Sequence, residues 1–159
     1  MITKPTTKFY KIYQMIGTGF YVGYTPVAPG TVASVATLPL YFILRFFPWT
    51  LYLGITLLLF LVGIKAANEI EKVLGQPDPG IVVIDEIVGY LLTLFLLPKT
   101  IGFVVGGFFL FRLFDIFKPL GIRKIDQNPN LAGFGTMADD AIAGIYSNLV
   151  LQVVHLLLK

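Results

Sequence analysis

The sequence predicts an all-α protein, a multi-helical membrane bundle of about five apolar helices, some of them too short to cross a bilayer fully. Hydrophobic residues make up 56% of the chain and charged residues 13%, whereas soluble globular chains carry roughly 45–50% and about 25%. The mean hydropathy of +0.81 leaves too few polar side chains to cover a soluble fold of this size. With 159 residues, the chain is expected to form one domain, over residues 1–159.

The first two apolar runs predict a helical hairpin. Residues 32–47 carry a single charge, on Arg45, and Pro48 separates them from residues 51–64, which carry none. Proline ends a helix because it lacks an N–H group and its ring clashes with the preceding turn. We expect the polar stretch 65–78 that follows to lie outside the hydrocarbon.

Three further runs complete the predicted bundle. Residues 81–97 and 101–117 form a second hairpin around Pro98, and residues 141–158 form the last helix after a glycine-containing loop at 121–135. At 1.5 Å per residue, the part of the third run that follows its acidic residues reaches only about 20 Å, whereas a hydrocarbon core is roughly 30 Å thick. Some helices are therefore expected to dip partway into the bilayer.

The two hairpin turns place the other ends of the first four helices on one side, which we name the polar face. Most of the basic residues fall on that face, and fewer fall opposite. Because cytoplasmic loops carry an excess of Lys and Arg, the polar face is predicted to be cytoplasmic. The basic residues on the polar face are Lys4, Lys8, Lys11, Lys65, Lys72, Arg112, Lys118, Arg123 and Lys124, and those opposite are Arg45, Lys99 and Lys159.

The composition also limits the partners and the chemistry. The chain has no cysteine, which excludes a cysteine nucleophile and metal sites built on thiolates. Its net charge of +3 comes from cations near the ends of apolar runs, which indicates a membrane surface as the partner and no nucleic acid. The oligomeric state is left open.

Five carboxylates fall at helix ends on the polar face. Asp85 and Glu86 begin the third helix, Asp115 lies near the end of the fourth, and Asp139 and Asp140 precede the fifth. They converge only if these three helices pack together.

Small residues one turn inside the acids make this packing possible. Gly89 follows Asp85 at helical spacing, and Ala143 and Gly144 follow the last two acids. Small side chains let two helix backbones approach closely inside a membrane. We therefore expect the third and fifth helices to be in contact.

The clustered acids predict a divalent metal. Carboxylates repel one another unless a cation lies between them, and hard divalent cations prefer oxygen ligands. Mg²⁺ is the natural candidate because it keeps several waters and takes one or two carboxylates together with phosphate oxygens. The alternative is that the acids form only ordinary helix-end ion pairs with Arg112, Lys118, Arg123 and Lys124.

Basic and hydroxyl side chains near the acids indicate phosphate binding. Arg112 and Asp115 share a helix face, and Lys118 follows one turn later. Arg holds phosphate oxygens through paired hydrogen bonds, and Lys supplies a point charge. The turn before the first helix adds Thr31 and Ser34, near backbone N–H groups of a helix N-terminus that can bind an anion. For Thr31, helix capping alone is an equal alternative.

These motifs, taken together, resemble the phosphatidylglycerophosphatase A family. The resemblance covers residues 17–149 and departs from the family pattern at Ala33, at Ala132 and in a loop one residue longer after Asp126. The four motifs that carry it are Ala-Pro-Gly-Thr at 28–31, Asp-Glu-Ile-Val-Gly at 85–89, Phe-Arg-Leu-Phe-Asp-Ile-Phe-Lys-Pro at 111–119 and Gly-Thr-Met-Ala-Asp-Asp at 135–140.

The resemblance implies an all-helical, magnesium-dependent phosphatase of the bacterial inner membrane. Such an enzyme hydrolyses phosphatidylglycerophosphate to phosphatidylglycerol, the last step in making that lipid. Arg112 and Lys118 would then bind the substrate phosphate. The acidic active-site set, and with it the metal ligands, would be Asp85, Glu86, Asp115, Asp139 and Asp140.

Our mechanistic hypothesis is that these acids share one or two Mg²⁺ ions and that a water attacks phosphorus in line. An aspartyl-phosphate route is the alternative chemistry. A different class of function, a small ion or proton transporter, would also use membrane carboxylates. The single histidine, His155, lies in the last apolar run and is interpreted as a packing or interface residue.

Overall fold

A computed structural model describes residues 8–119, 121–122, 125 and 131–159 of the chain, with only the backbone given for Lys8 and Phe9. Every element in these residues is helical, as the sequence predicts. The predicted polar-face residues Lys4, Arg123 and Lys124 lie outside the described part. The longer loop after Asp126 also lies outside it.

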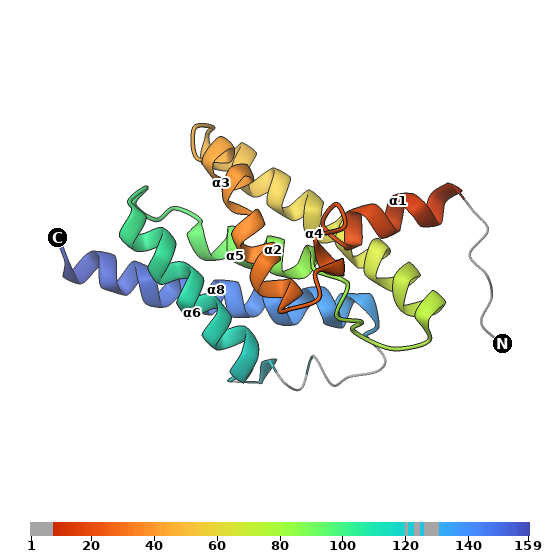
Figure 1. Cartoon of the computed structure of the whole chain (residues 1–159). Coiled ribbons are helices and arrows are strands. Elements are labelled where there is room, and N and C mark those ends of the chain that lie inside the picture. Colours follow the sequence, from red (N-terminus) through yellow and green to blue (C-terminus); the bar gives the residue numbers. More distant parts are fainter. Residues whose placement is uncertain (1–7, 120, 123–124, 126–130) are drawn as a thin grey trace.

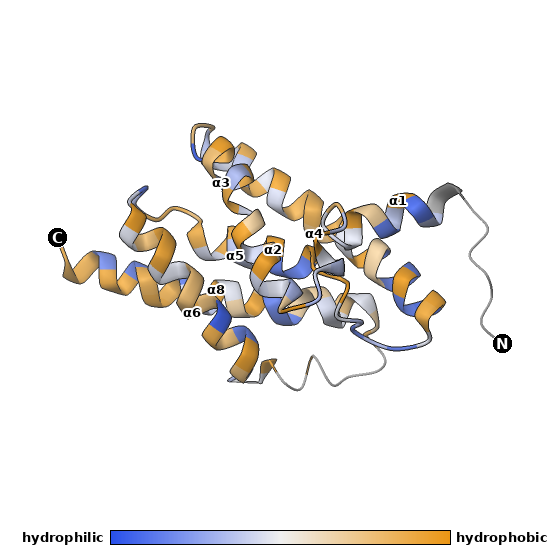
Figure 2. Cartoon of the chain, in the orientation of Figure 1, coloured by the Kyte–Doolittle hydropathy of each residue, from blue (hydrophilic) through white to orange (hydrophobic). Residues whose placement is uncertain are grey.

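Two long helices form the frame of the bundle. Helix α4 runs over Trp49–Leu74, with 26 residues, and α8 over Gly133–Leu157, with 25. In the described part of the chain these two are long and apolar enough to cross a membrane. Figure 2 shows the apolar colouring concentrated on α3, the first half of α4, α6 and the C-terminal half of α8.

The expectation of about five apolar helices, some of them not fully spanning, is corrected: in the described residues, two helices are long and apolar enough to cross a membrane. The first predicted run is split into α2 (Pro29–Ala36) and α3 (Leu38–Leu44), because Pro39 has no N–H to continue the helical ladder. Helix α5 (Ile84–Leu94) has 11 residues and α6 (Ile101–Phe117) has 17. At 1.5 Å per residue they extend only about 16 and 26 Å.

Two predicted boundaries are also wrong. Helix α4 continues through the stretch 65–74 because Ala66, Ala67 and Ile70 repeat at helical spacing and are buried, while Lys65 and Lys72 are exposed. Glu71 is buried as well. Helix α8 begins at Gly133 instead of residue 141. The glycines of the expected loop serve close packing in this helix.

Helices α5 and α8 form the centre of the molecule, with α4 and α6 packed against them (Figure 1). A Cβ atom at Gly144 would lie 2.2 Å from the carbonyl oxygen of Gly89, and one at Gly89 would lie 2.7 Å from that of Asp140. The predicted close contact of these two helices through small residues is confirmed.

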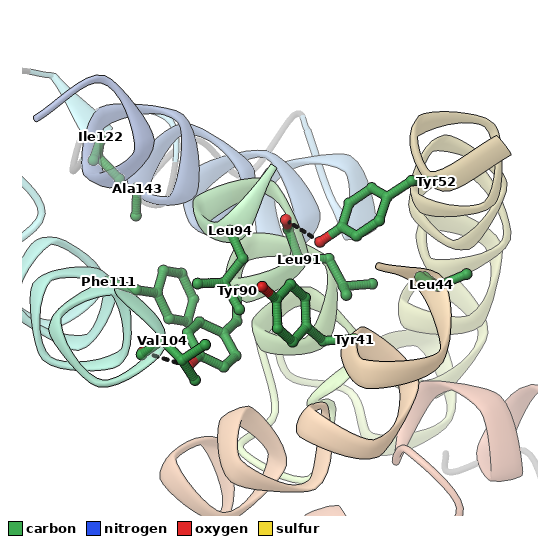
Figure 3. Close-up of a cluster of buried hydrophobic side chains, with 10 residues drawn as sticks. All are labelled: Tyr41, Leu44, Tyr52, Tyr90, Leu91, Leu94, Val104, Phe111, Ile122 and Ala143. Atoms are coloured by element: carbon green, nitrogen blue, oxygen red, sulfur yellow. Dashed lines mark hydrogen bonds between the residues drawn. The ribbon is translucent and has the colours of Figure 1, made fainter. Parts of the chain in front are cut away.

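Short helices cover the remaining sides. Helix α1 (Lys8–Gly17) packs on α4, and the 3₁₀ turn η1 (Val22–Tyr24) and α2 pack together, with α2 resting on α5. Figure 3 shows the main apolar cluster, in which Tyr41, Tyr52 and Phe111 lie around Tyr90, Leu91 and Leu94 of α5.

The short helix α5 ends inside the bundle, and polar side chains satisfy its last carbonyl groups. The Tyr52 hydroxyl donates to the Leu91 carbonyl at 2.7 Å (Figure 3). The Asn148 amide donates to the carbonyls of Thr93 and Phe95 at 2.9 and 2.7 Å. A helix can end within a membrane only where protein groups replace water as partners, and these residues meet that requirement.

Replacing Asn148 by Leu is therefore expected to destabilise the protein. The change leaves the carbonyls of Thr93 and Phe95 without this donor, at a cost of about 1–3 kcal/mol of unfolding free energy. Denaturant unfolding in detergent measures the loss. The control is Gln152→Leu, which removes only a 3.4 Å contact to the Phe95 carbonyl and should cost less. Equal losses in both variants would contradict this role for Asn148.

Candidate active site

Three of the five predicted acids form one compact group. Asp85 and Glu86 lie in the first turn of α5, and Asp140 lies in α8. One carboxylate oxygen from each lies within 4.8 Å of the others. Asp85 and Asp140 are buried, and Glu86 is mostly buried. We name these three residues the carboxylate cluster.

The oxygens of the carboxylate cluster lack protein donors. Asp85 Oδ1, Glu86 Oε2 and Asp140 Oδ2 are buried and have no hydrogen-bond partner among the described residues. A buried carboxylate without a donor or cation is strongly unfavourable. The cluster therefore has the donor set and the unmet charge that a hard divalent cation satisfies.

Electrostatics at the start of α5 support the same interpretation. Burial raises the pKa of Asp85 well above its ordinary value, and the neighbouring Glu86 carboxylate raises it further. Burial also raises the pKa of Glu86. The charged forms are thus disfavoured without a cation, and a bound cation would favour them.

The other two acids are paired with basic side chains. Arg112 Nη1 lies 2.6 Å from Asp115 Oδ2, and it lies 3.9 Å from Glu86 Oε1. The Lys118 ammonium pairs with Asp139 Oδ2. The alternative of ordinary ion pairs thus describes Asp115 and Asp139, whereas in the part of the chain that the structure describes no basic side chain pairs with Asp85 or Asp140.

The local backbone directs Lys118 toward α8. Lys118 is the C-cap of α6 and has a φ of 45°, in the left-handed region. A non-glycine residue adopts this conformation at an energetic cost, and such strain is often found at functional sites. The turn ends α6 before Pro119 and carries the ammonium group to Asp139.

The first turn of α2 approaches the cluster closely at a glycine. A Cβ atom at Gly30 would lie 1.9 Å from Glu86 Oε1 and 3.0 Å from Arg112 Nη1. The N-cap of α2 is Ala28 and makes no side-chain capping bond, so the alternative that Thr31 is the helix cap is wrong. Ser34 is fully buried, and its hydroxyl donates to the Gly30 carbonyl at 2.9 Å.

Two residues of α4 that the sequence analysis left without a role hold the start of α8. The Thr136 hydroxyl donates to Glu71 Oε1 at 2.7 Å, and the Gly133 N–H donates to Asn68 Oδ1 at 2.8 Å. Their spacing of three residues puts Asn68 and Glu71 on one helix face. That spacing is the available signal, whereas the polar composition of this stretch predicts only a position outside the hydrocarbon.

A sixth acid lies near the group. Asp78 is exposed, has a φ of 42°, and interacts electrostatically with Asp85 and Asp139. It stands before α5, at the end of the polar stretch 65–78 that the sequence predicts to lie outside the hydrocarbon. His155, by contrast, packs edge-on against Phe103 with ring centroids 5.6 Å apart, as expected of a packing residue.

Comparisons with known proteins agree on a family of phosphatases. Residues 15–155 match the family model of phosphatidylglycerophosphatase A. The chain is 34% identical over 154 residues to phosphatidylglycerophosphatase A of Escherichia coli K12, covering 96% of this chain and 89% of that protein. It is 35% identical over 143 residues to the protein of the same name from Haemophilus influenzae, covering 89% and 87%.

A further relative has a different printed name. The chain is 43% identical over 148 residues to a Bacteroides thetaiotaomicron protein named "Putative phosphatidylinositol-3-phosphatase", covering 87% of this chain and 91% of that protein. No solved structure matches the chain. The family match and the similarity to both phosphatidylglycerophosphatases extend over most of the sequence. The chain therefore belongs to the phosphatidylglycerophosphatase A family.

Proposed function

We propose that this protein is a Mg²⁺-dependent lipid phosphatase that converts phosphatidylglycerophosphate to phosphatidylglycerol and inorganic phosphate in phospholipid biosynthesis. The observation that carries the proposal is the carboxylate cluster, with buried oxygens that lack donors, beside two cations. Two relatives bear the name of this activity. The transporter hypothesis gains no support, since the named relatives are phosphatases.

In this proposal the five acids have two different tasks. Asp85, Glu86 and Asp140 would hold the cation. When bound, the cation supplies positive charge that offsets the negative charge of the phosphate, and it makes a water more acidic. Asp115 and Asp139 hold Arg112 and Lys118 in place beside the cluster.

The basic residues would bind the substrate. Arg112 and Lys118 would donate to phosphate oxygens and stabilise the charge that develops as the ester bond breaks. Thr31, in the first turn of α2, would add a backbone N–H and a hydroxyl. Ser34 already donates its proton to Gly30, so the phosphate-binding proposal rests on Arg112, Lys118 and Thr31. A carboxylate that does not bind metal would accept the proton of the attacking water.

The location we propose is a bacterial inner membrane, crossed more than once, with the carboxylate cluster facing the cytoplasm. In support of this orientation, the contacts of Asn68 and Glu71 join the C-terminal half of α4 to the start of α8, the helix that carries Asp140 of the cluster. The excess of Lys and Arg that the sequence assigns to this side supports a cytoplasmic orientation.

The Gly30→Ala variant is expected to lower phosphate release about tenfold to a hundredfold, because small displacements of catalytic groups have effects of that size. The added methyl group would displace the Glu86 carboxylate, whereas stability should change little because that side chain is flexible at its end. Gly102→Ala is the matched control, since a Cβ atom at that position would meet no atom within 4 Å. Unchanged activity in Gly30→Ala would contradict a role for this contact.

Phosphate release from a panel of lipid phosphates tests the function. We expect the purified protein to hydrolyse phosphatidylglycerophosphate faster than phosphatidylinositol 3-phosphate or phosphatidic acid. EDTA should lower the rate at least about a hundredfold, and added Mg²⁺ should restore it. Faster hydrolysis of phosphatidylinositol 3-phosphate would reassign the substrate, and EDTA-resistant activity would remove the metal from the mechanism.

A further inference from the structure

A second polar feature lies at the far end of α5 from the carboxylate cluster. A cavity of about 180 Å³ is enclosed by the end of α3, the start of α4 and residues 94–97 after α5. Asp85 begins α5 and Phe95 is its C-cap, so the helix separates the two places by roughly 15 Å. The catalytic proposal makes no use of this cavity.

The cavity walls are apolar and aromatic except for two cations. Arg45 and Lys99 line it, and among the described residues that line it there is no acid. Arg45 Nε is buried without an acceptor in the described structure. The Lys99 ammonium donates to the Arg45 carbonyl, so these two residues are in contact where they line the cavity.

The Arg45 guanidinium is held in position by aromatic rings. Its central carbon lies 5.4 Å from the Phe42 ring centroid and 5.6 Å from that of Phe46. Such cation–π contacts orient the group without neutralising it. A guanidinium with an unused donor beside an ammonium is suited to a phosphate, which accepts hydrogen bonds from both.

The surroundings of the cavity indicate a membrane lipid as the source of that phosphate. Phe47 and Trp49 line the cavity and are exposed, and Trp49 is the first residue of a candidate membrane span. Exposed aromatic residues at the end of a span are typical of the membrane interface, where phospholipid headgroups lie. The apolar walls would contact the adjoining part of an acyl chain.

We infer that this cavity binds an anionic phospholipid, with the headgroup phosphate on Arg45 and Lys99, at a site separate from the carboxylate cluster. The charge complementarity and the exposed aromatic residues carry this assignment. A zwitterionic lipid would bring its own cation to a place that already holds two.

Trp49 provides a local probe because it is the single tryptophan of the chain. Bromine atoms on an acyl chain quench tryptophan fluorescence only at short range. The protein is placed in phosphatidylcholine vesicles that contain a minor fraction of dibrominated phosphatidylglycerol or, in parallel, the same fraction of dibrominated phosphatidylcholine. We expect the anionic lipid to be enriched about tenfold near Trp49, given two cations at the site, and hence to quench more strongly.

Variants and a competitor distinguish the possible outcomes. The Arg45→Gln/Lys99→Gln double variant should lose the preference, whereas Lys159→Gln, which removes a cation that does not line the cavity, should keep it. Phosphate release shows whether each variant is folded. If the double variant does not fold, Lys99→Gln alone replaces it and should weaken the preference. Equal quenching by both lipids in the unmodified protein, or an unchanged preference in the folded variants, would overturn the inference. If inorganic phosphate abolished the preference, the phosphate group alone would account for binding at this site. That result would overturn a lipid as the source of the bound phosphate.

Discussion

Asp85→Asn is expected to lower phosphate release by about a thousandfold, the scale seen when a group that organises transition-state charge is removed. The amide has nearly the shape of the carboxylate but carries no negative charge. Asp85 is 6% exposed and belongs to the carboxylate cluster, so the change removes one of three anionic ligands. Phosphate release from phosphatidylglycerophosphate in Mg²⁺ measures the effect.

The fold should tolerate this substitution. Burial raises the pKa of Asp85, so a neutral side chain is already favoured there in the absence of a cation. Glu69→Gln serves as the control, because Glu69 is partly exposed and pairs with Lys72 on the surface of α4. Near-normal activity in a folded Asp85→Asn protein would show that this acid is not part of the catalytic site.

Gly144→Ala is expected to have the largest effect on stability. The new methyl carbon would lie 2.2 Å from the carbonyl oxygen of Gly89 and 2.9 Å from its carbonyl carbon. These are backbone atoms, so α5 and α8 must move apart, and overpacking of this kind typically costs about 1–3 kcal/mol or more. Thermal unfolding in detergent and phosphate release measure the two consequences.

Activity should fall together with stability in Gly144→Ala, because the same contact brings Asp85 and Asp140 together. Gly54→Ala is the matched control, since nothing lies within 4 Å of the place that a Cβ atom would take there on α4. A Gly144→Ala protein with unchanged unfolding temperature and activity would refute the close approach of the two helices.

The sequence predicted correctly those features that depend on residue type and local spacing. The all-helical architecture follows from the apolar runs, and the contact of α5 with α8 follows from Gly89 and Gly144. The sequence also brings Asp85, Glu86 and Asp140 to one place, as the structure has them, and the chemistry that these acids serve stays a prediction.

The lengths of the helices could not be predicted in this way. Average hydropathy does not show which side of a helix is buried, so the polar composition of residues 65–74 hides that α4 continues through them. Gly133 was counted as a loop residue, yet its missing Cβ lets α8 approach the Asn68 backbone, where a Cβ atom would be 2.6 Å away. Both errors arise because tertiary contacts decide where these helices begin and end.

The division of the acids also depends on the packing. Asp139 and Asp140 are adjacent in the sequence, but one pairs with Lys118 and the other faces Asp85 and Glu86. From their positions in the sequence, both residues are predicted to be metal ligands. The orientation of α8, held by Asn68 and Glu71 through its first residues, separates their tasks in the proposal.

Binding of Mn²⁺, followed by electron paramagnetic resonance, tests most directly whether the carboxylate cluster is a metal site. We expect the purified protein to bind Mn²⁺ at a site from which Mg²⁺ displaces it. Asp140→Asn should weaken this binding at least about tenfold, as loss of a carboxylate ligand requires. Glu69→Gln should bind as the unmodified protein does. Equal Mn²⁺ affinity in the unmodified protein and in a folded Asp140→Asn variant would contradict the assignment of the cluster as a metal site.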